Sequence, residues 1–200
     1  WDFTDKMIDA IKSYPNIMPY VHLPLQSGSD RILKLMGRRY TSDEYKILFD
    51  KLKTIPNISI TTDIIVGFPT ETEDDFNKTI EMVNYCKYDS AFTFIYSPRV
   101  GTPAAKLYEK DSLTEDEKNK RLYELNDLIN SYSLAHNVKL LNTNQKVLVE
   151  GFSNKENQLF GYTETNKLVN FKGTEDLIGK IVNVKIIDAK SFSLDGELVE

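Results

Sequence analysis

A strand, turn and helix unit over residues 58–86 constrains this chain more than any other stretch. Residues 58–66 read ISITTDIIV, an apolar run rich in β-branched side chains that ends at the Gly-Phe-Pro turn of residues 67–69, so they predict a strand. Thr72 and Asp75 then form a capping pair, after which apolar residues recur at helical spacing. We therefore expect a strand that passes at once into a helix.

The same unit occurs once upstream and once downstream. Residues 19–25 (PYVHLPL) end in a Gln-Ser-Gly-Ser turn, and residues 91–96 (AFTFIY) end in a loop that contains proline and glycine. Repeated βα units predict parallel strands with helices outside them, as in part of an open (β/α) barrel. In such barrels the chemistry lies at the carboxyl ends of the strands, here residues 26–29, 67–71 and 96–101.

Polar side chains alternate along each of these strands. They are His22 and Gln26 in the first strand, Ser59, Thr61 and Asp63 in the second, and Thr93 and Ser97 in the third. A strand buried on both faces reads as a continuous apolar run, so these faces border either a ligand or water. Alternation alone predicts the inside of a barrel and a sheet with one face in water equally, and the repeated βα units favour the barrel.

Three parallel strands cannot close a barrel. The chain begins at Trp1 rather than at a methionine, so we expect further strands upstream. An open sheet edge is a template for pairing. We expect this edge to pair with a second copy of the chain, or to be covered by a rearranged terminal segment.

The pattern changes at residue 138, after a long helix that Thr114 and Glu117 cap. Five short β runs follow, separated by turn residues: 147–150, 159–163, 168–171, 181–187 and 192–198. They predict a small five-stranded antiparallel barrel of the oligonucleotide-binding kind. The chain thus divides into residues 1–137 and 138–200. From Leu141 onward there are seven lysines and nine acidic residues, so a plain packing domain is the alternative.

Composition restricts the function further. The net charge of −5 and the pI of about 5.2 argue against a large basic face, so any RNA contact is local. No apolar run reaches the about 20 residues that span a bilayer, and no signal peptide opens the chain, which predicts a cytoplasmic protein without membrane contact. Cys86 is the single cysteine, so it cannot hold a cluster alone, and we expect it to be packed near a helix end.

Several stretches resemble the tRNA methylthiotransferases of the MiaB type, which are radical SAM enzymes. They are HLPLQSGSDRILKLMGRRYT, TTDIIVGFPTETEDDF, FTFIYSPRVGTPAA and VLVEGFSNKENQLFGYTETNKLVNF, followed by IGKIVNVKI and SLDGE. Together they cover nearly the whole chain in order. The resemblance implies that residues 1–137 are the C-terminal half of a radical SAM barrel and that residues 138–200 are a TRAM domain.

The resemblance also implies an activity. Such enzymes use S-adenosylmethionine and two 4Fe-4S clusters to insert sulfur and a methyl group at C2 of N6-isopentenyladenosine, beside the tRNA anticodon. The cluster cysteines are missing from this chain, so we expect no bound cofactor and an inactive fragment. The alternatives are a relative that modifies an aspartate of a ribosomal protein and a non-catalytic RNA-binding module; Ser27-Gly28 favours the tRNA branch.

Site residues follow from the same resemblance. Those implied to line the S-adenosylmethionine site are Gln26, Ser27, Asp63, Gly67 and Tyr96, with Arg99 facing a carboxylate of substrate or cofactor. From residues alone, Arg99 is equally a surface arginine in a turn. Those implied to contact the tRNA anticodon stem-loop are Thr163, Asn166 and Lys167. Two positions depart from the family: Thr70 replaces a frequent glycine, and Tyr162 replaces an arginine, which leaves stacking as its contact with RNA.

Overall fold

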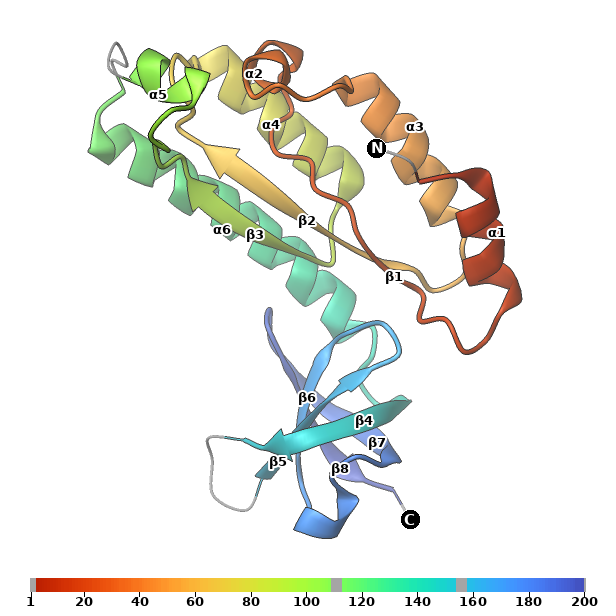
Figure 1. Ribbon diagram of the computed structural model, residues 1–200. Coiled ribbons are helices and arrows are strands. Elements are labelled where there is room, and N and C mark those ends of the chain that lie inside the picture. Colours follow the sequence, from red (N-terminus) through yellow and green to blue (C-terminus); the bar gives the residue numbers. More distant parts are fainter. Residues whose placement is uncertain (1–2, 109–112, 154–157, 200) are drawn as a thin grey trace.

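A small sheet covered by helices and a closed β-barrel make up the structure (Figure 1). The computed structural model describes residues 3–108, 113–153 and 158–199; Trp1 lies outside these ranges. The first part comprises α1 (Asp5–Ser13), β1 (Tyr20–His22), α2 (Asp30–Leu35), α3 (Ser42–Lys53), β2 (Ser59–Val66), α4 (Glu73–Cys86), β3 (Ser90–Ile95), α5 (Pro103–Tyr108) and α6 (Glu115–Val138).

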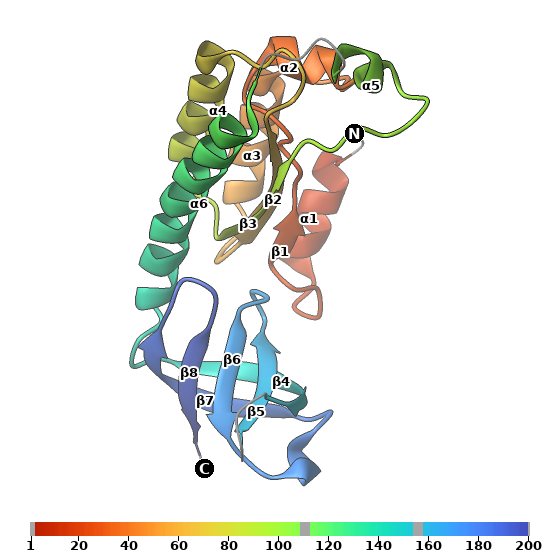
Figure 2. The same ribbon diagram turned by 90° about the vertical axis from the view of Figure 1, so that its left-hand side faces the viewer.

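The three strands form one parallel sheet in the order β1-β2-β3, as the repeated βα units predict. Figure 2 shows the sheet nearly edge-on, with α4 and α6 on one side of it. Neither β1 nor β3 pairs with a further strand among the described residues. The sheet is therefore a section of a barrel with one open face, and both of its edges are unpaired within the described part of the chain.

Three of the helices begin with a complete capping box. The pairs are Thr41 with Glu44, Thr72 with Asp75 and Thr114 with Glu117, and in each the threonine side chain accepts from the N3 backbone while the acid reaches back to the N-cap. The boxes satisfy backbone N–H groups that the first helical turn leaves free. The boxes at Thr72 and Thr114 are confirmed at the predicted residues, and all three pairs lie within four residues of sequence, so the helix starts are set locally.

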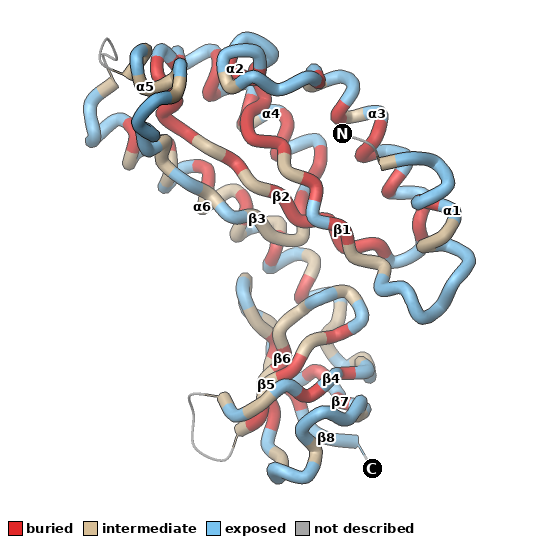
Figure 3. The backbone as a smooth tube through the Cα atoms, in the orientation of Figure 1, coloured by how far each residue is buried: buried red, intermediate tan, exposed pale blue. Residues whose placement is uncertain are grey.

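The main core lies between the sheet and α3, α4 and α6, and Figure 3 shows how buried residues concentrate there. Tyr45 and Tyr88 are fully buried, yet both hydroxyls are satisfied: Tyr88 donates to the Tyr45 oxygen at 2.9 Å, and Tyr45 donates to the Leu23 carbonyl at 2.7 Å. Buried hydroxyls without partners would cost stability. Cys86 ends α4 and is 4% exposed, which confirms the prediction of a packed cysteine.

The second part is the barrel, with strands β4 (Asn144–Phe152), β5 (Gln158–Thr163), β6 (Leu168–Lys172), β7 (Ile181–Ala189) and β8 (Leu194–Leu198), and the short 3₁₀ helix η1 (Glu175–Leu177) before β7. All five predicted strands are present, and they close in the order β4-β5-β6-β8-β7. The expectation of a fully antiparallel barrel is wrong at one junction, because β6 and β8 run parallel. A closed ring with an odd number of strands cannot alternate direction at every pair, so one parallel pair is required.

Helix α6 connects the two parts. It packs along β3 and β2 and continues past the sheet to the barrel (Figure 1). At its last turn the Asn137 side-chain amide donates to the backbone carbonyls of Lys190 and Ser191, in the turn between β7 and β8. The barrel is thereby held below the amino ends of the three strands.

Candidate functional site

The open face of the sheet carries side chains that point away from the helices. Strand β2 buries Ile60, Thr62, Ile64 and Val66 almost completely. The alternate residues of β2 lie on the other face, and the register pairs Thr61 with His22 and Asp63 with Phe92. Neighbouring residues in register project to the same side of a sheet. The open face therefore combines polar groups from β1 and β2 with aromatic rings from β3.

The prediction that Thr93 and Ser97 supply the polar face of the third strand is wrong. Thr93 pairs with Ile64 of the buried face, and its hydroxyl donates to Asn126 Oδ1 of α6 at 2.6 Å. Ser97 lies beyond the strand, which ends at Ile95. Phe92 and Phe94 take the open face instead, 61% and 51% exposed. Because side chains alternate, an error of one residue exchanges the two faces.

A chain of hydrogen-bonded polar groups crosses the open face. His22 Nε2 lies 3.3 Å from Asp63 Oδ2, and His22 Nδ1 lies 2.9 Å from the Thr61 hydroxyl. The Thr61 hydroxyl also lies 3.0 Å from the Tyr20 hydroxyl. His22 and Asp63 side chains are 34% and 29% exposed, so both reach the open face. The sequence marked His22 and Asp63 as polar positions, but the pairing needed the register of β1 on β2, which alternation does not give.

The turn after β1 brings Gln26 and Ser27 to the carboxyl end of the sheet. Gln26 has a positive φ of 66°, and its side-chain Oε1 accepts from Arg38 at 2.6 Å. Ser27 is fully buried, and its hydroxyl accepts from the Ser29 backbone N–H at 3.2 Å. Both side chains are therefore engaged within the turn, and the Gln26 backbone pairs with β2 through Asp63 and Ile65.

The turn after β2 is held by helix α6. The Gly67 N–H donates to Glu71 Oε1 at 3.0 Å, and Arg121 Nη1 donates to the same oxygen at 2.7 Å. Burial raises the pKa of Glu71, and the hydrogen bonds from Gly67 and Arg121 oppose that effect. A Cβ on Gly67 would lie 2.7 Å from Cγ of the buried Lys118 side chain, so this turn and α6 are in direct contact.

The end of β3 completes the carboxyl edge. The Tyr96 ring packs edge-on against Phe68, with centroids 4.9 Å apart, and lies 6.0 Å from the Tyr108 ring. Arg99 is exposed in the following loop, where its backbone carbonyl accepts from Thr102. The predicted residues Gly67 and Tyr96 thus meet through Phe68 at one edge of the sheet. Asp63 lies further down β2, with His22.

On the barrel, the three residues implied to contact RNA lie around the turn between β5 and β6. Thr163 is 2% exposed, and its hydroxyl lies 3.1 Å from the Thr165 hydroxyl and accepts from the Lys167 backbone N–H at 3.1 Å. Lys167 Nζ forms an ion pair with Asp89 Oδ1 at 3.0 Å. Asn166 is exposed at a positive φ of 59°. Thr163 and Lys167 therefore fix the turn at which Asn166 is exposed.

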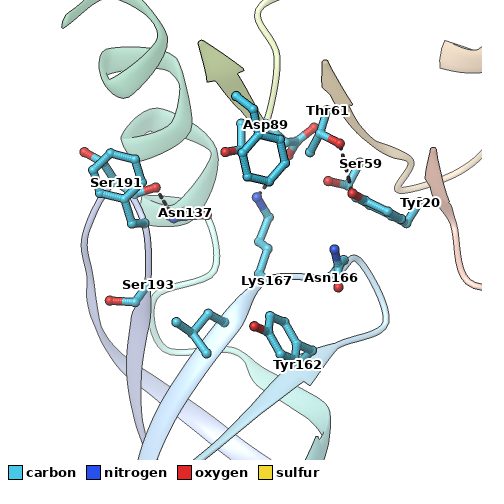
Figure 4. Close-up of a pocket in the computed structure, with 14 residues that line it drawn as sticks. Tyr20, Ser59, Thr61, Asp89, Asn137, Tyr162, Asn166, Lys167, Ser191 and Ser193 are labelled. Atoms are coloured by element: carbon cyan, nitrogen blue, oxygen red, sulfur yellow. Dashed lines mark hydrogen bonds and ion pairs between the residues drawn. The ribbon is translucent and has the colours of Figure 1, made fainter. Parts of the chain in front are cut away.

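A cavity of about 290 Å³ lies between the sheet and the barrel. We call it the interdomain cavity, and it is lined by Tyr20, Asp89 and Phe92 from the sheet part and by Tyr162, Asn166 and Phe192 from the barrel, among others. Figure 4 shows Lys167 reaching up from the barrel toward Asp89, with Tyr162 and Asn166 to one side of it. Tyr20 and Thr61 link this cavity to the hydrogen-bonded chain on the open face.

The described residues do not fit an iron–sulfur cluster. Burial raises the pKa of the Cys86 thiol to about 12, and a cluster requires several accessible thiolates. No group of histidine, cysteine and acidic side chains suited to a metal ion occurs among them. S-Adenosylmethionine is a different case, because the partly exposed Asp63 carboxylate suits a ligand that offers hydroxyl and ammonium donors.

Helices of the kind that cross a membrane, long and apolar throughout, do not occur in the described ranges.

Comparison with known proteins defines the class. Residues 1–83 match the Radical SAM superfamily, and residues 139–199 match the TRAM domain. A solved structure with a similar fold is coproporphyrinogen III oxidase (HemN) from Escherichia coli, described as a radical SAM enzyme; the TM-score is 0.54 at 17% identity, over 66% of this chain and 30% of that one. The chain thus contains a region that matches the radical SAM superfamily, followed by a TRAM domain.

Curated relatives narrow the class. This chain is 50% identical over its whole length to the tRNA-2-methylthio-N(6)-dimethylallyladenosine synthases of Bacillus cytotoxicus and Oceanobacillus iheyensis, and 48% identical to that of Staphylococcus haemolyticus. It covers 39%, 38% and 39% of those proteins, respectively. The chain thus spans about two fifths of the length of these relatives, and the similarity extends through both the sheet part and the barrel.

Proposed function

We propose that this chain is the carboxyl-terminal part of a tRNA-2-methylthio-N(6)-dimethylallyladenosine synthase. The observation that carries the proposal is the 50% identity over the entire chain, which includes the strand ends, the α6 connection and the barrel. The complete protein would insert sulfur and a methyl group at C2 of the isopentenylated adenosine next to the tRNA anticodon. It would hold S-adenosylmethionine and iron–sulfur clusters, with the cluster ligands outside this chain.

The sheet part would provide one wall of the S-adenosylmethionine site. When bound, S-adenosylmethionine supplies the 5′-deoxyadenosyl radical of this enzyme class. Asp63 would accept hydrogen bonds from the bound molecule, and His22 would keep the Asp63 carboxylate oriented through its 3.3 Å contact. Gln26, Ser27 and Gly67 would act through the shape of their turns, and Tyr96 would pack beside the ligand. Arg99 would pair with a carboxylate of substrate or cofactor.

The barrel would bind the tRNA anticodon stem-loop. It carries no excess of positive charge, so its contacts with RNA would rest on specific groups rather than on general attraction to phosphates. Asn166 is exposed for hydrogen bonding, while Thr163 and Lys167 would hold the turn in which it lies. The unpaired sheet edges would pair with a second copy, or be covered by another segment of the protein.

An activity assay tests the proposal. The complete protein that contains this chain is reconstituted anaerobically and given either isopentenylated tRNA or the ribosomal protein that related enzymes modify. We expect the methylthio group in nucleosides released from the tRNA, detected by mass spectrometry. Methylthio product on the ribosomal protein alone would favour the protein-modifying alternative. No product from either, with tRNA binding intact, would favour the RNA-binding module.

A matched pair of variants tests the role of Asp63. Asp63→Asn keeps the size of the side chain and removes its charge, so we expect weaker S-adenosylmethionine binding by the complete protein in equilibrium dialysis. Asp188→Asn makes the same change on the barrel and serves as the control. If both variants bind S-adenosylmethionine equally well, Asp63 does not contribute to its binding site.

A further inference from the structure

We infer that the interdomain cavity binds one unstacked base of a single-stranded RNA segment. This inference deepens the proposed function and rests on RNA as the partner of the chain. It assigns the base to a cavity at the amino ends of the strands, whereas the turns proposed to shape the S-adenosylmethionine site lie at the carboxyl ends and Asp63 lies between the two. Strand β2 has eight residues, so the two ends are separated by about 25 Å.

Aromatic rings from the two parts of the chain lie at the cavity, among them Phe92, Tyr162 and Phe192. Phe192, in the turn between β7 and β8, is 71% exposed, and Phe92 at the start of β3 is 61% exposed. Tyr162 of β5 lines the same cavity, on the same side of Lys167 as Asn166 in Figure 4. Exposed aromatic rings that gather at one cavity mark a contact surface, whereas rings scattered singly do not. Single-stranded RNA is recognised chiefly by stacking of splayed-out bases on such rings.

The charged side chains that line the cavity neutralise each other. They are Lys167 and Asp89, which pair at 3.0 Å with side chains only 13% and 11% exposed. The cavity therefore offers no free cation to a phosphate among the residues that line it. A neutral, flat heterocycle suits it better than the RNA backbone does.

The interdomain cavity has polar groups at its rim and is small. Asn166 presents an amide, with both donor and acceptor, and no hydrogen bond joins its side chain to the described residues. Hydroxyl groups of Tyr20 and Ser193 lie at the same cavity. Its volume of about 290 Å³ is at the lower limit of ligand pockets, which suits a single base rather than a larger molecule. The donors and acceptors at its rim would read the edge of that base.

Fluorescence of a base analogue tests the inference. Stem-loop RNAs that carry 2-aminopurine at successive loop positions are titrated with the chain of residues 1–200, since stacking on an aromatic ring quenches this base. We expect quenching at one loop position. Phe192→Ala and Tyr162→Ala should each abolish that quenching and weaken RNA binding by about 5- to 150-fold, which is the range for loss of one stacked base.

Phe152→Ala is the matched control, because Phe152 is 58% exposed on the same barrel and does not line the cavity. It should retain the quenching, and circular dichroism checks the fold of all three variants. Equal quenching in wild type, Phe192→Ala and Tyr162→Ala would overturn the inference, as would displacement of the RNA by inorganic pyrophosphate but not by free nucleoside. Either result leaves the methylthiotransferase assay unaffected, so failure of the inference is distinct from failure of the proposed function.

Discussion

Lys167 of the barrel and Asp89 at the start of β3 form an ion pair between the two parts of the chain, with Nζ 3.0 Å from Oδ1. The second oxygen of Asp89 accepts from the Ile60 backbone N–H at 3.0 Å. The carboxylate therefore joins the sheet and the barrel at a largely buried position. The family resemblance implies an RNA contact for Lys167, and the structure gives its ammonium group a partner 78 positions away in the sequence.

Lys167→Met should destabilise the chain by about 3–5 kcal/mol, because it leaves the Asp89 carboxylate buried without its partner. Urea unfolding measures the free energy, and small-angle scattering should report a larger radius of gyration as the barrel separates from the sheet. Lys146→Met is the control: its pair with Glu164 is about two-thirds exposed on both sides, so the cost should stay under about 1 kcal/mol. Equal costs for the two variants would contradict a joining role.

Asp75 should make stability depend on acid. Burial disfavours its ionised form, but hydrogen bonds from Arg31, Ser29 and Thr72 outweigh burial and hold the pKa of Asp75 well below its usual range. A lowered folded-state pKa stabilises the fold above the ordinary carboxyl pKa of about 4, and this contribution is lost as the pH falls below that value. Asp75→Asn should cost about 2 kcal/mol at pH 7, and urea unfolding should show the difference from wild type shrinking below about pH 4. Asp74→Asn is the control: its carboxylate is 77% exposed in a pair with Lys78, so its cost at pH 7 should stay under about 1 kcal/mol.

Thr70→Gly should stabilise the chain by about 1 kcal/mol. Thr70 has a positive φ of 71°, a conformation that is unfavourable for a β-branched residue and suits glycine. The substitution loses a hydrogen bond from Arg31 to the Thr70 hydroxyl, but Arg31 also donates to the Thr70 backbone carbonyl, which is retained. Thr54→Gly, at a negative φ of −76°, should instead destabilise. Thermal unfolding compares the two, and a loss of stability in Thr70→Gly would show that its side chain outweighs the backbone strain.

Gly67→Ala should cost about 2 kcal/mol or more, because the new methyl group adds a clash to an unfavourable backbone angle. Its Cβ would lie 2.7 Å from Lys118 Cγ, at a φ of 65°. Gly37→Ala is the matched control, with a φ of 73° and no atom within 4 Å of the added Cβ, so its cost should be about 1 kcal/mol. Chemical denaturation gives the free energy of unfolding of both variants, and the difference between their losses is the contribution of the contact with α6. Equal losses of stability would show that the Lys118 side chain moves aside freely.

Cys86 should resist modification in the folded chain. It is 4% exposed, and burial raises the pKa of its thiol to about 12, so little thiolate forms at neutral pH. Iodoacetamide at pH 8 should leave native chain unlabelled and label it rapidly in urea, as read by mass spectrometry. Rapid labelling under native conditions would show that α4 opens at its carboxyl end.

Local features of the fold were predictable from the sequence. The strand, turn and helix units, the three capping boxes and the five barrel strands all follow from residue types within a few positions of each other. The sequence did not predict which face of β3 is open. A shift of one residue exchanges the faces on which Phe92 and Thr93 lie, and only the register against Asp63 and Ile64 decides between them. The parallel β6–β8 pair likewise depends on closure of the whole ring.

The candidate site was predictable in part. The turns after the strands hold Gln26, Ser27, Gly67 and Tyr96 at the predicted edge, and their roles in cofactor binding stay predictions. The hydrogen bond from Arg121 to Glu71 joins residues 50 positions apart, so no local sequence pattern predicts it. The interdomain cavity combines side chains from both parts of the chain, so it exists only once the barrel has docked.

Helix α6 determines how far the barrel lies from the carboxyl ends of the strands. Near the start of the helix, Arg121 donates to Glu71 in the turn after β2. Near its end, Asn137 donates to the Lys190 carbonyl of the barrel. Arg121 and Asn137 are 16 positions apart, a distance of about 24 Å along an α-helix, and each residue adds a rotation of about 100°. The length of α6 thus sets both the distance and the orientation of the barrel relative to the sheet. Inserting one residue would rotate the barrel about the helix axis. A change of length by whole turns would alter only the distance between the Arg121 and Asn137 contacts.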